Sequence, residues 1–316
     1  MSSAPTAASS ADRRLGLLMA ATTAVLWGFL AIALKVALGR VPTVTIVWFR
    51  FAVAFPLLCL LVGARRPSRL AILARPPVLG VLSAVGLTAN YVTYLMGVDM
   101  TSPSNAQVLI QLAPLLLAGT GVLWFGERLT RRQMGWGLVA LAGMVLFYRD
   151  QLGQLVGEGA SRHLEGNLWI VVGAVSWTAY AALQKLVVAR GASPQDLNLV
   201  LYLLPCLVLW PWVEWDALAA LSPAWWGLMA FLGLNTLLAY GALGEALKRL
   251  PAHEVSLIII CNPLITLVTM AVLTALEVSW IAPDRVGLTG YLAGGVVVLG
   301  VFGFLRKPGA GRGRRA

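Results

Sequence analysis

Ten long apolar runs alternate with short polar links along this chain of 316 residues, and they constrain its fold more than any other feature. A helix of about 20 apolar residues crosses the hydrocarbon core of a bilayer. A lipid-exposed backbone must satisfy its own hydrogen bonds, so we expect every run to be helical. The prediction is an all-α integral membrane protein with ten transmembrane helices, at approximately residues 16–38, 43–63, 77–97, 104–124, 134–148, 167–188, 197–213, 223–246, 254–275 and 286–305.

The composition excludes several other classes of protein. Hydrophobic residues make up 59% of the chain and charged residues 12%, whereas soluble domains carry about 25% charge. The three cysteines lie inside apolar runs, so no disulfide framework is expected. With two histidines and no close cysteine pair, we expect neither a metal site nor another cofactor. The net charge of +11 comes from links and the C-terminal tail, so we expect no nucleic-acid partner.

The distribution of positive charge predicts the orientation in the membrane. If the N-terminus is cytoplasmic, the cytoplasmic links and the tail hold most of the 24 Lys and Arg residues. The opposite links then hold only Arg40, Arg149, Arg162 and Arg285. Because short cytoplasmic loops are enriched in Lys and Arg, we expect both termini in the cytoplasm of a multi-pass inner (plasma) membrane protein. The first run is too long for a cleavable signal peptide.

The two halves of the chain resemble each other at an offset near 150 residues. Ala24–Trp27 matches Ala174–Trp177, Lys35 matches Lys185, and Pro114 matches Pro263 one residue out of step. Each half has five predicted spans, an odd number, so the second half must enter the membrane from the opposite face. We expect a disordered N-terminus over 1–15, repeats over 16–148 and 167–305, an extracytoplasmic connection over 149–166 and a basic cytoplasmic tail over 306–316.

Several motifs resemble the drug/metabolite transporter superfamily and its ten-helix EamA-type members. They are Gln111–Leu115, Gly126–Thr130, Ala246–Ala252, Arg50-Phe51, and the tryptophans Trp27 and Trp177. The second repeat departs from the pattern, since Val278-Ser279-Trp280 follows Glu277. The resemblance implies a secondary carrier, most often an exporter of amino acids or related metabolites that works by alternating access.

Polar and aromatic side chains within the spans are the candidates for substrate binding, because polar groups at membrane depth are costly. Many recur at helical spacing, as Asn90 and Tyr94 do. Interhelical hydrogen bonding and packing are the alternative roles. The candidate set is Trp27, Arg50, Asn90, Tyr91, Tyr94, Gln107, Gln111, Trp177, Asn235, Tyr240, Ser256 and Asn262.

A second set of residues could control helix shape, gating or ion coupling. Pro114 and Pro263 are expected to kink their helices. Lys35 and Lys185 could snorkel to the interface or act as paired gate charges. Glu245 and His253 are weak candidates for proton coupling, while Glu245 also fits an ion pair with Lys248 or Arg249.

The leading hypothesis is therefore an exporter, and the same architecture would serve an importer or an exchanger. A lipid-modifying membrane enzyme is an alternative, although no nucleophile or acid–base pair accompanies the two histidines. The expected partners are a small-molecule substrate, the lipid bilayer and, as a candidate coupling ion, a proton. Gly290 and Gly294 permit close helix packing, so the protein could be a monomer or a homodimer.

Overall fold

A computed structural model describes residues 10–126, 128–153 and 158–306, and within these ranges the chain is helical, with no β-strand. The chain is an all-α integral membrane protein, and eight of its described helical segments are long and apolar enough to cross a membrane. In chain order the ten spans are α1 (Ser10–Leu38), α2 (Thr43–Arg65), α3 (Val78–Met100), α4 (Pro103–Leu109) with α5 (Leu112–Phe125), α6 (Arg131–Gly153), α7 (Glu158–Ala189), α8 (Pro194–Leu209), α10 (Pro223–Arg249), α11 (Ala252–Ile259) with α12 (Asn262–Ala275), and α13 (Leu288–Leu305).

The two spans outside the eight are α6 and α8, which correspond to the two shortest apolar runs in the sequence. Helix α6 has Arg131 and Arg132 in its first turn and Arg149 and Asp150 near its end, which lower its mean hydropathy. Helix α8 is shorter, and the 3₁₀ turn η2 (Trp210–Trp212) extends it. The remaining short elements, η1 (Pro67–Leu73) and α9 (Trp215–Ala219), lie in links.

The fourth and ninth spans are interrupted, near the two prolines that were expected to kink their helices. The first break lies at Ile110–Gln111 and the second at Ile260–Cys261. Each precedes a proline near the start of the following helix, Pro114 in α5 and Pro263 in α12. A proline has no N–H and its ring collides with the carbonyl four residues earlier, which explains why the helix is interrupted at these positions.

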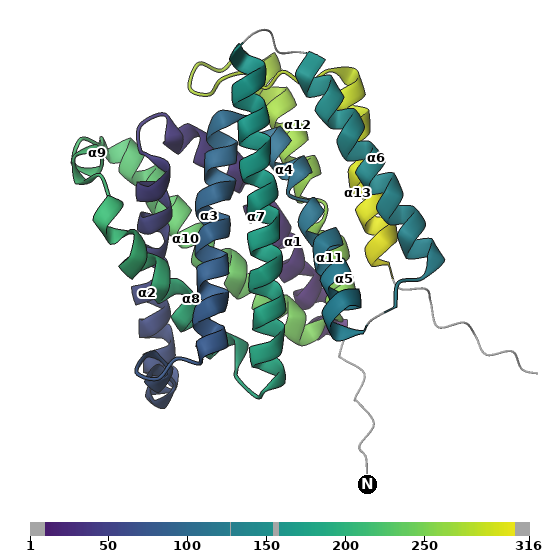
Figure 1. Ribbon diagram of the computed structural model, residues 1–316. Coiled ribbons are helices and arrows are strands. Elements are labelled where there is room, and N and C mark those ends of the chain that lie inside the picture. The colour runs from purple at the N-terminus through teal and green to yellow at the C-terminus, as the bar shows by residue number, and fades with distance from the viewer. Residues whose placement is uncertain (1–9, 127, 154–157, 307–316) are drawn as a thin grey trace, which may run out of the picture.

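The helices form an up-and-down bundle in which α1 begins and α13 ends at the same end (Figure 1). We call this the basic end and the opposite one the far end. Helix α3 packs along α7, α1 along α10 and α6 along α13. The largest buried cluster joins α1, α2, α3, α7, α8 and α10, including Phe51, Leu87 and Tyr202.

Several helix limits differ from the predicted ones. Helix α1 already begins at Ser10, so residues 10–15 are helical, which contradicts the expected disorder there. Residues 1–9 and the tail beyond Arg306 lie outside the described residues. Helices α6 and α7 also extend into the expected connection over 149–166.

Candidate functional site

Three consecutive backbone carbonyls of α1 accept hydrogen bonds from side chains of three other helices. Asn235 Nδ2 of α10 donates to the Leu26 carbonyl at 3.1 Å. Gln107 Nε2 of α4 donates to the Trp27 carbonyl at 2.8 Å, and Thr266 Oγ1 of α12 donates to the Gly28 carbonyl at 2.6 Å. This stretch of α1 therefore joins α10 to both broken spans.

Two further predicted amides also bond to backbone carbonyls. Gln111 Nε2 donates to the Ile260 carbonyl at 3.4 Å. Asn90 Nδ2 of α3 donates to the Gly173 carbonyl of α7 at 2.9 Å. The amide nitrogens of Asn90, Gln107, Gln111 and Asn235 are thus used in interhelical bonding, the alternative role considered from the sequence.

Arg50 is a buried cation in the first third of α2. Its residue surface is 4% exposed. Its Nε donates to Thr236 Oγ1 of α10 at 3.2 Å, and its guanidinium lies 4.7 Å from the centre of the Tyr91 ring. Among the described residues, no ion pair includes Arg50. An arginine in this environment has an unneutralised charge and further N–H donors for an anion.

Aromatic rings surround this cation. Phe51 contacts Tyr91 and Tyr202, with ring centres 4.7 Å and 5.5 Å apart. Tyr240 lies 6.4 Å from Tyr202 and 5.6 Å from Trp27 of α1. The four tyrosines that interact electrostatically with Arg50 are Tyr91, Tyr94, Tyr202 and Tyr240. Residues from α1, α2, α3, α8 and α10 thus build one aromatic site around one guanidinium.

Lys35 lies apart from this site, at the far end of α1. Its Nζ donates to three carbonyls at the end of α3, those of Val98, Asp99 and Thr101, at 2.9, 2.7 and 2.9 Å. A cation bonded to the last carbonyls of a helix stabilises that helix end. The structure thus places Lys35 in a helix-capping role, which was neither of the roles considered from the sequence.

The remaining candidate residues lie outside the aromatic site or contribute less to it. Lys185 is exposed near the basic end of α7. Glu245 pairs with Lys248 and Arg249 on its own helix. Trp177 packs on Tyr180, with ring centres 6.2 Å apart. Ser256 and Asn262 are half-buried, in α11 and at the start of α12. The side chain of His253, like residue Glu127, lies outside the described part of the chain.

Three contributors to the site were absent from the sequence-based set. Tyr202 is 2% exposed and belongs to the aromatic ring around Arg50. Thr236 binds the guanidinium, and Thr266 binds the Gly28 carbonyl. A lone tyrosine in the apolar run of the seventh span was the available signal for Tyr202, whereas nothing in the sequence distinguishes these threonines from the many that bond within their own helix.

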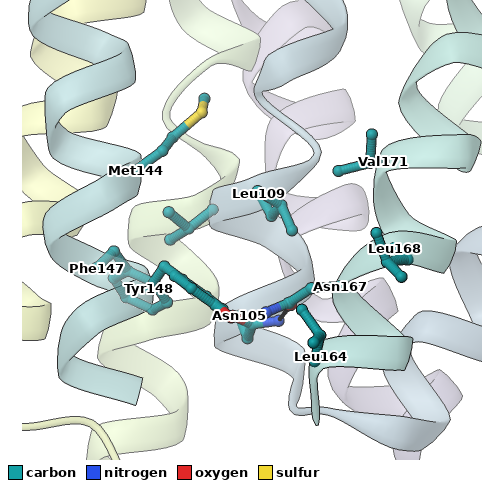
Figure 2. Close-up of a pocket in the computed structure, with 10 residues that line it drawn as sticks. Asn105, Leu109, Met144, Phe147, Tyr148, Leu164, Asn167, Leu168 and Val171 are labelled. Atoms are coloured by element: carbon teal, nitrogen blue, oxygen red, sulfur yellow. Dashed lines mark hydrogen bonds between the residues drawn. The ribbon is translucent and has the colours of Figure 1, made fainter. Parts of the chain in front are cut away.

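An apolar pocket of about 240 Å³ lies away from Arg50, between α4, α6 and α7 (Figure 2). Leu164, Leu168 and Met144 are among its lining residues. At one edge Asn105 Nδ2 donates to Asn167 Oδ1 at 2.6 Å. None of the residues predicted to bind substrate lines this pocket.

The far end also holds a buried carboxylate, Asp284, in the link between α12 and α13. Asp284 is 4% exposed, and its Oδ2 accepts the backbone N–H of Ser104 at 3.2 Å. Its Oδ1 is buried without a hydrogen-bond partner. Burial raises the pKa of this carboxyl above its ordinary value of 3.8.

Comparison with known proteins connects this architecture to a family. The model of the EamA-like transporter family matches the chain twice, over residues 14–149 and 164–306. A solved structure superposes with a TM-score of 0.62 at 22% identity, covering 92% of this chain and 97% of its own, which shows a shared fold.

Curated relatives agree with this match. The "Uncharacterized inner membrane transporter YhbE" of Escherichia coli strain K12 is 33% identical over 305 residues, covering 93% of this chain and 94% of the relative. An "Uncharacterized transporter" of Haemophilus influenzae is 31% identical, with 90% and 93% covered. A "Probable amino-acid metabolite efflux pump" of Escherichia coli K12 is 24% identical, with 81% and 85% covered. The chain is a multi-pass inner membrane protein and belongs to the EamA-like transporter family.

Proposed function

We propose that this protein is a secondary carrier that exports a small metabolite, an amino acid or a related compound, by alternating access, and that the carboxylate of the substrate binds Arg50. One observation carries the proposal: a guanidinium buried to 4% exposure without an ion pair among the described residues. A buried charge costs several kcal/mol unless it is compensated. A substrate carboxylate supplies that compensation, and a bidentate carboxylate fits the geometry of the guanidinium.

The broken spans support alternating access. The breaks at Ile110–Gln111 and Ile260–Cys261 lie 150 residues apart, at the offset found between the two halves of the sequence. Discontinuous helices in corresponding positions of two inverted repeats are the common architecture of secondary carriers, with the substrate site at the repeat interface. Two similar packings of such halves differ little in free energy, so a bound substrate can shift their populations.

Three observations favour export. A relative is named as a probable amino-acid metabolite efflux pump. The positive-inside rule assigns the basic end to the cytoplasm. Pro103–Val108 of α4, toward the far end, are all buried, whereas Pro114–Thr120 of α5, toward the basic end, are only partly buried. A site open toward the basic end would load from the cytoplasm.

Counterflow in proteoliposomes tests the proposal. The purified full-length protein is reconstituted, loaded with each member of a panel of amino acids and their deaminated derivatives, and assayed for uptake of the labelled compound with and without a pH gradient. Arg50→Gln should abolish the flux of the compound that moves. Arg40→Gln is the matched control, because Arg40 also lies over an aromatic ring, that of Trp225 at 5.9 Å, but is exposed. The proposal fails if no compound moves, or if Arg50→Gln and Arg40→Gln behave alike.

A further inference from the structure

The arrangement of charges around Arg50 restricts the class of substrate that the site can bind. This inference rests on the proposed function. We propose that the site takes a monoanionic carboxylate whose α-substituent is uncharged and whose body is apolar and ring-bearing, in preference to a zwitterionic amino acid. The inference rests on three features of the site: a cation without a counter-charge, the lack of a place for an ammonium group, and the ring of aromatic side chains.

The cation attracts one negative charge and repels a positive one. The groups that interact electrostatically with Arg50 are Tyr91, Tyr240, Tyr94 and Tyr202, all uncharged phenols near neutral pH. A carboxylate bound at Arg50 places its α-substituent only a few bonds away. In a site with little water, an ammonium at that position is repelled by the guanidinium, unless a protein carboxylate compensates it.

Such a carboxylate is absent from the described residues near the site. Every acidic side chain that the structure describes lies in a link, in the short helix α9 or within two turns of a helix end. Glu245, on the same helix as Thr236, is already paired with Lys248 and Arg249 toward the basic end. An ammonium group beside Arg50 would have no anionic partner among these residues.

Four backbone carbonyls of α1 and the second break already accept side-chain donors. Those of Leu26, Trp27 and Gly28 lie inside α1, where each accepts the N–H of the helical turn, and each also accepts a side-chain donor. A carbonyl oxygen has two lone pairs, so the backbone donor and the side-chain donor together use the full accepting capacity of each of these three oxygens. At the breaks, the Ile260 carbonyl accepts from Gln111. The Gln111 amide and the Ile260 carbonyl are thus bonded to each other.

A neutral acceptor lies at the α1 side of the site. Asn235 Oδ1 is buried without a hydrogen-bond partner, and the Nδ2 of the same side chain bonds to the carbonyl of Leu26, the residue before Trp27. A single amide oxygen fits one donor, such as an α-hydroxyl, whereas an ammonium presents three donors and a full charge. The unfilled acceptor therefore favours a hydroxy acid over an amino acid.

The aromatic side chains define the body of the substrate. Trp27, Tyr91, Tyr94 and Tyr240 are half-buried, and the three tyrosines interact electrostatically with Arg50. Aromatic faces and edges favour ring-bearing ligands through offset and edge-to-face contacts. The complementary molecule is a carboxylate joined by a short linker to an apolar ring.

Four phenyl compounds, three with the same nine-carbon skeleton and one that lacks only the carboxyl carbon, separate the effect of the head group from that of the body. They are 3-phenyllactate and 3-phenylpropionate, which are anions, L-phenylalanine, a zwitterion, and phenethylamine, a cation. Calorimetric titration of the full-length protein in detergent should give both anions an affinity at least about tenfold above that of phenylalanine. Phenethylamine should not bind, and phenyllactate should exceed phenylpropionate.

Two substitutions test whether the preference arises at this site. Arg50→Gln should remove binding of the anions, while Arg40→Gln leaves it unchanged. Asn235→Asp adds a carboxylate beside Thr236 and should reduce the advantage of phenyllactate over phenylalanine by about tenfold or more. This second variant retains Arg50 but loses the Asn235 donor to the Leu26 carbonyl, so its melting temperature is measured beside its binding.

The wild-type series alone can overturn the inference. Phenylalanine binding as tightly as phenyllactate would refute the uncharged α-substituent, and failure of all four compounds to bind would refute the ring-bearing body. Either result leaves the carrier proposal standing, because that proposal fails only in the flux assays with the wider panel or with Arg50→Gln. Tight binding of both anions with weak binding of phenylalanine supports the inference.

Discussion

Gln111 at the break of the fourth span donates its Nε2 hydrogen to the carbonyl of Ile260 at the break of the ninth, at 3.4 Å. The bond connects equivalent points of the two halves, since the breaks lie 150 residues apart. A broken helix leaves backbone carbonyls unpaired, and in a bilayer such groups need a partner from the protein. Gln111 supplies that partner and links the two discontinuous spans.

Replacing Gln111 with Ala should lower transport while the protein still inserts. The substitution leaves the Ile260 carbonyl without its side-chain donor, a loss of about 1 kcal/mol for a neutral hydrogen bond. Because the bond joins the two spans expected to move against each other, we expect a several-fold lower counterflow rate per inserted molecule. Gln133→Ala is the control, because Gln133 makes a local bond to Thr130 at the start of α6. Equal rates for the wild-type and Gln111→Ala proteins would remove this bond from the mechanism.

Lys35 and Lys185 correspond in the repeat but differ in their surroundings, which predicts different effects on stability. Lys35→Met removes three charge-assisted hydrogen bonds at the end of α3 and should cost about 2–4 kcal/mol. Lys185→Met changes an exposed position, where interactions are screened by solvent, and should cost about 1 kcal/mol or less. Thermal unfolding in detergent measures both. Similar shifts for the two variants would contradict the capping role of Lys35.

The sequence was sufficient to predict the all-α membrane fold, because ten apolar runs leave few other options for a chain in a bilayer. It could also identify residues such as Arg50 and Tyr91, since a cation or a phenol inside an apolar run is conspicuous. Their contacts could not be predicted, because residue type alone does not determine whether Asn235 or Gln107 faces a substrate or a neighbouring carbonyl.

The helix breaks are a second feature that the sequence could predict only in part. Pro114 and Pro263 indicated altered helices, but a proline can produce a kink or a break, and tertiary partners decide between them. Lys35 is a similar case, because a cation near a helix end fits both snorkelling and gating, and only the fold brings the end of α3 beside it. Asp284 was not a candidate at all, since an acidic residue in a link is ordinarily solvated, and only the fold buries it.

The buried carboxyl of Asp284 predicts a pH-dependent stability difference. Its raised pKa means that the folded protein binds this proton more tightly than the unfolded chain does. The associated stabilisation is fully present below the ordinary pKa of the carboxyl and is lost as the pH rises through the raised value. The neighbouring charged and titratable groups are Lys35, Tyr291 and Asp150.

The melting temperature of the Asp284→Asn protein minus that of the wild-type protein should therefore increase as the pH rises from about 4 to 8. At the acidic end both side chains are neutral, and the two melting temperatures should differ least. Comparing the two proteins at each pH cancels the contributions of the other carboxylates. A difference in melting temperature that stays constant across this pH range would contradict the raised pKa of Asp284.

Close packing of α13 on α6 predicts opposite outcomes for two nearby glycines. A Cβ on Gly300 would lie 2.5 Å from the backbone nitrogen of Ala140, which cannot move aside without shifting α6. A Cβ on Gly295 meets nothing within 4 Å. Gly300→Ala should thus cost about 1–3 kcal/mol through overpacking. Gly295→Ala should be neutral or stabilising by up to about 1 kcal/mol, because Ala favours helix more than Gly does.

Thermal unfolding of the two glycine variants in detergent, side by side with the wild-type protein, measures this contrast. Gly290 and Gly294 show why the comparison concerns packing within one chain. An added Cβ at Gly290 would collide with Asp150, and one at Gly294 would lie 2.8 Å from Leu267, both of the same molecule. If Gly300→Ala instead changed the oligomeric state in size-exclusion chromatography without lowering the melting temperature, this face of α13 would be an interface between copies, and the packing of α6 against it would need revision.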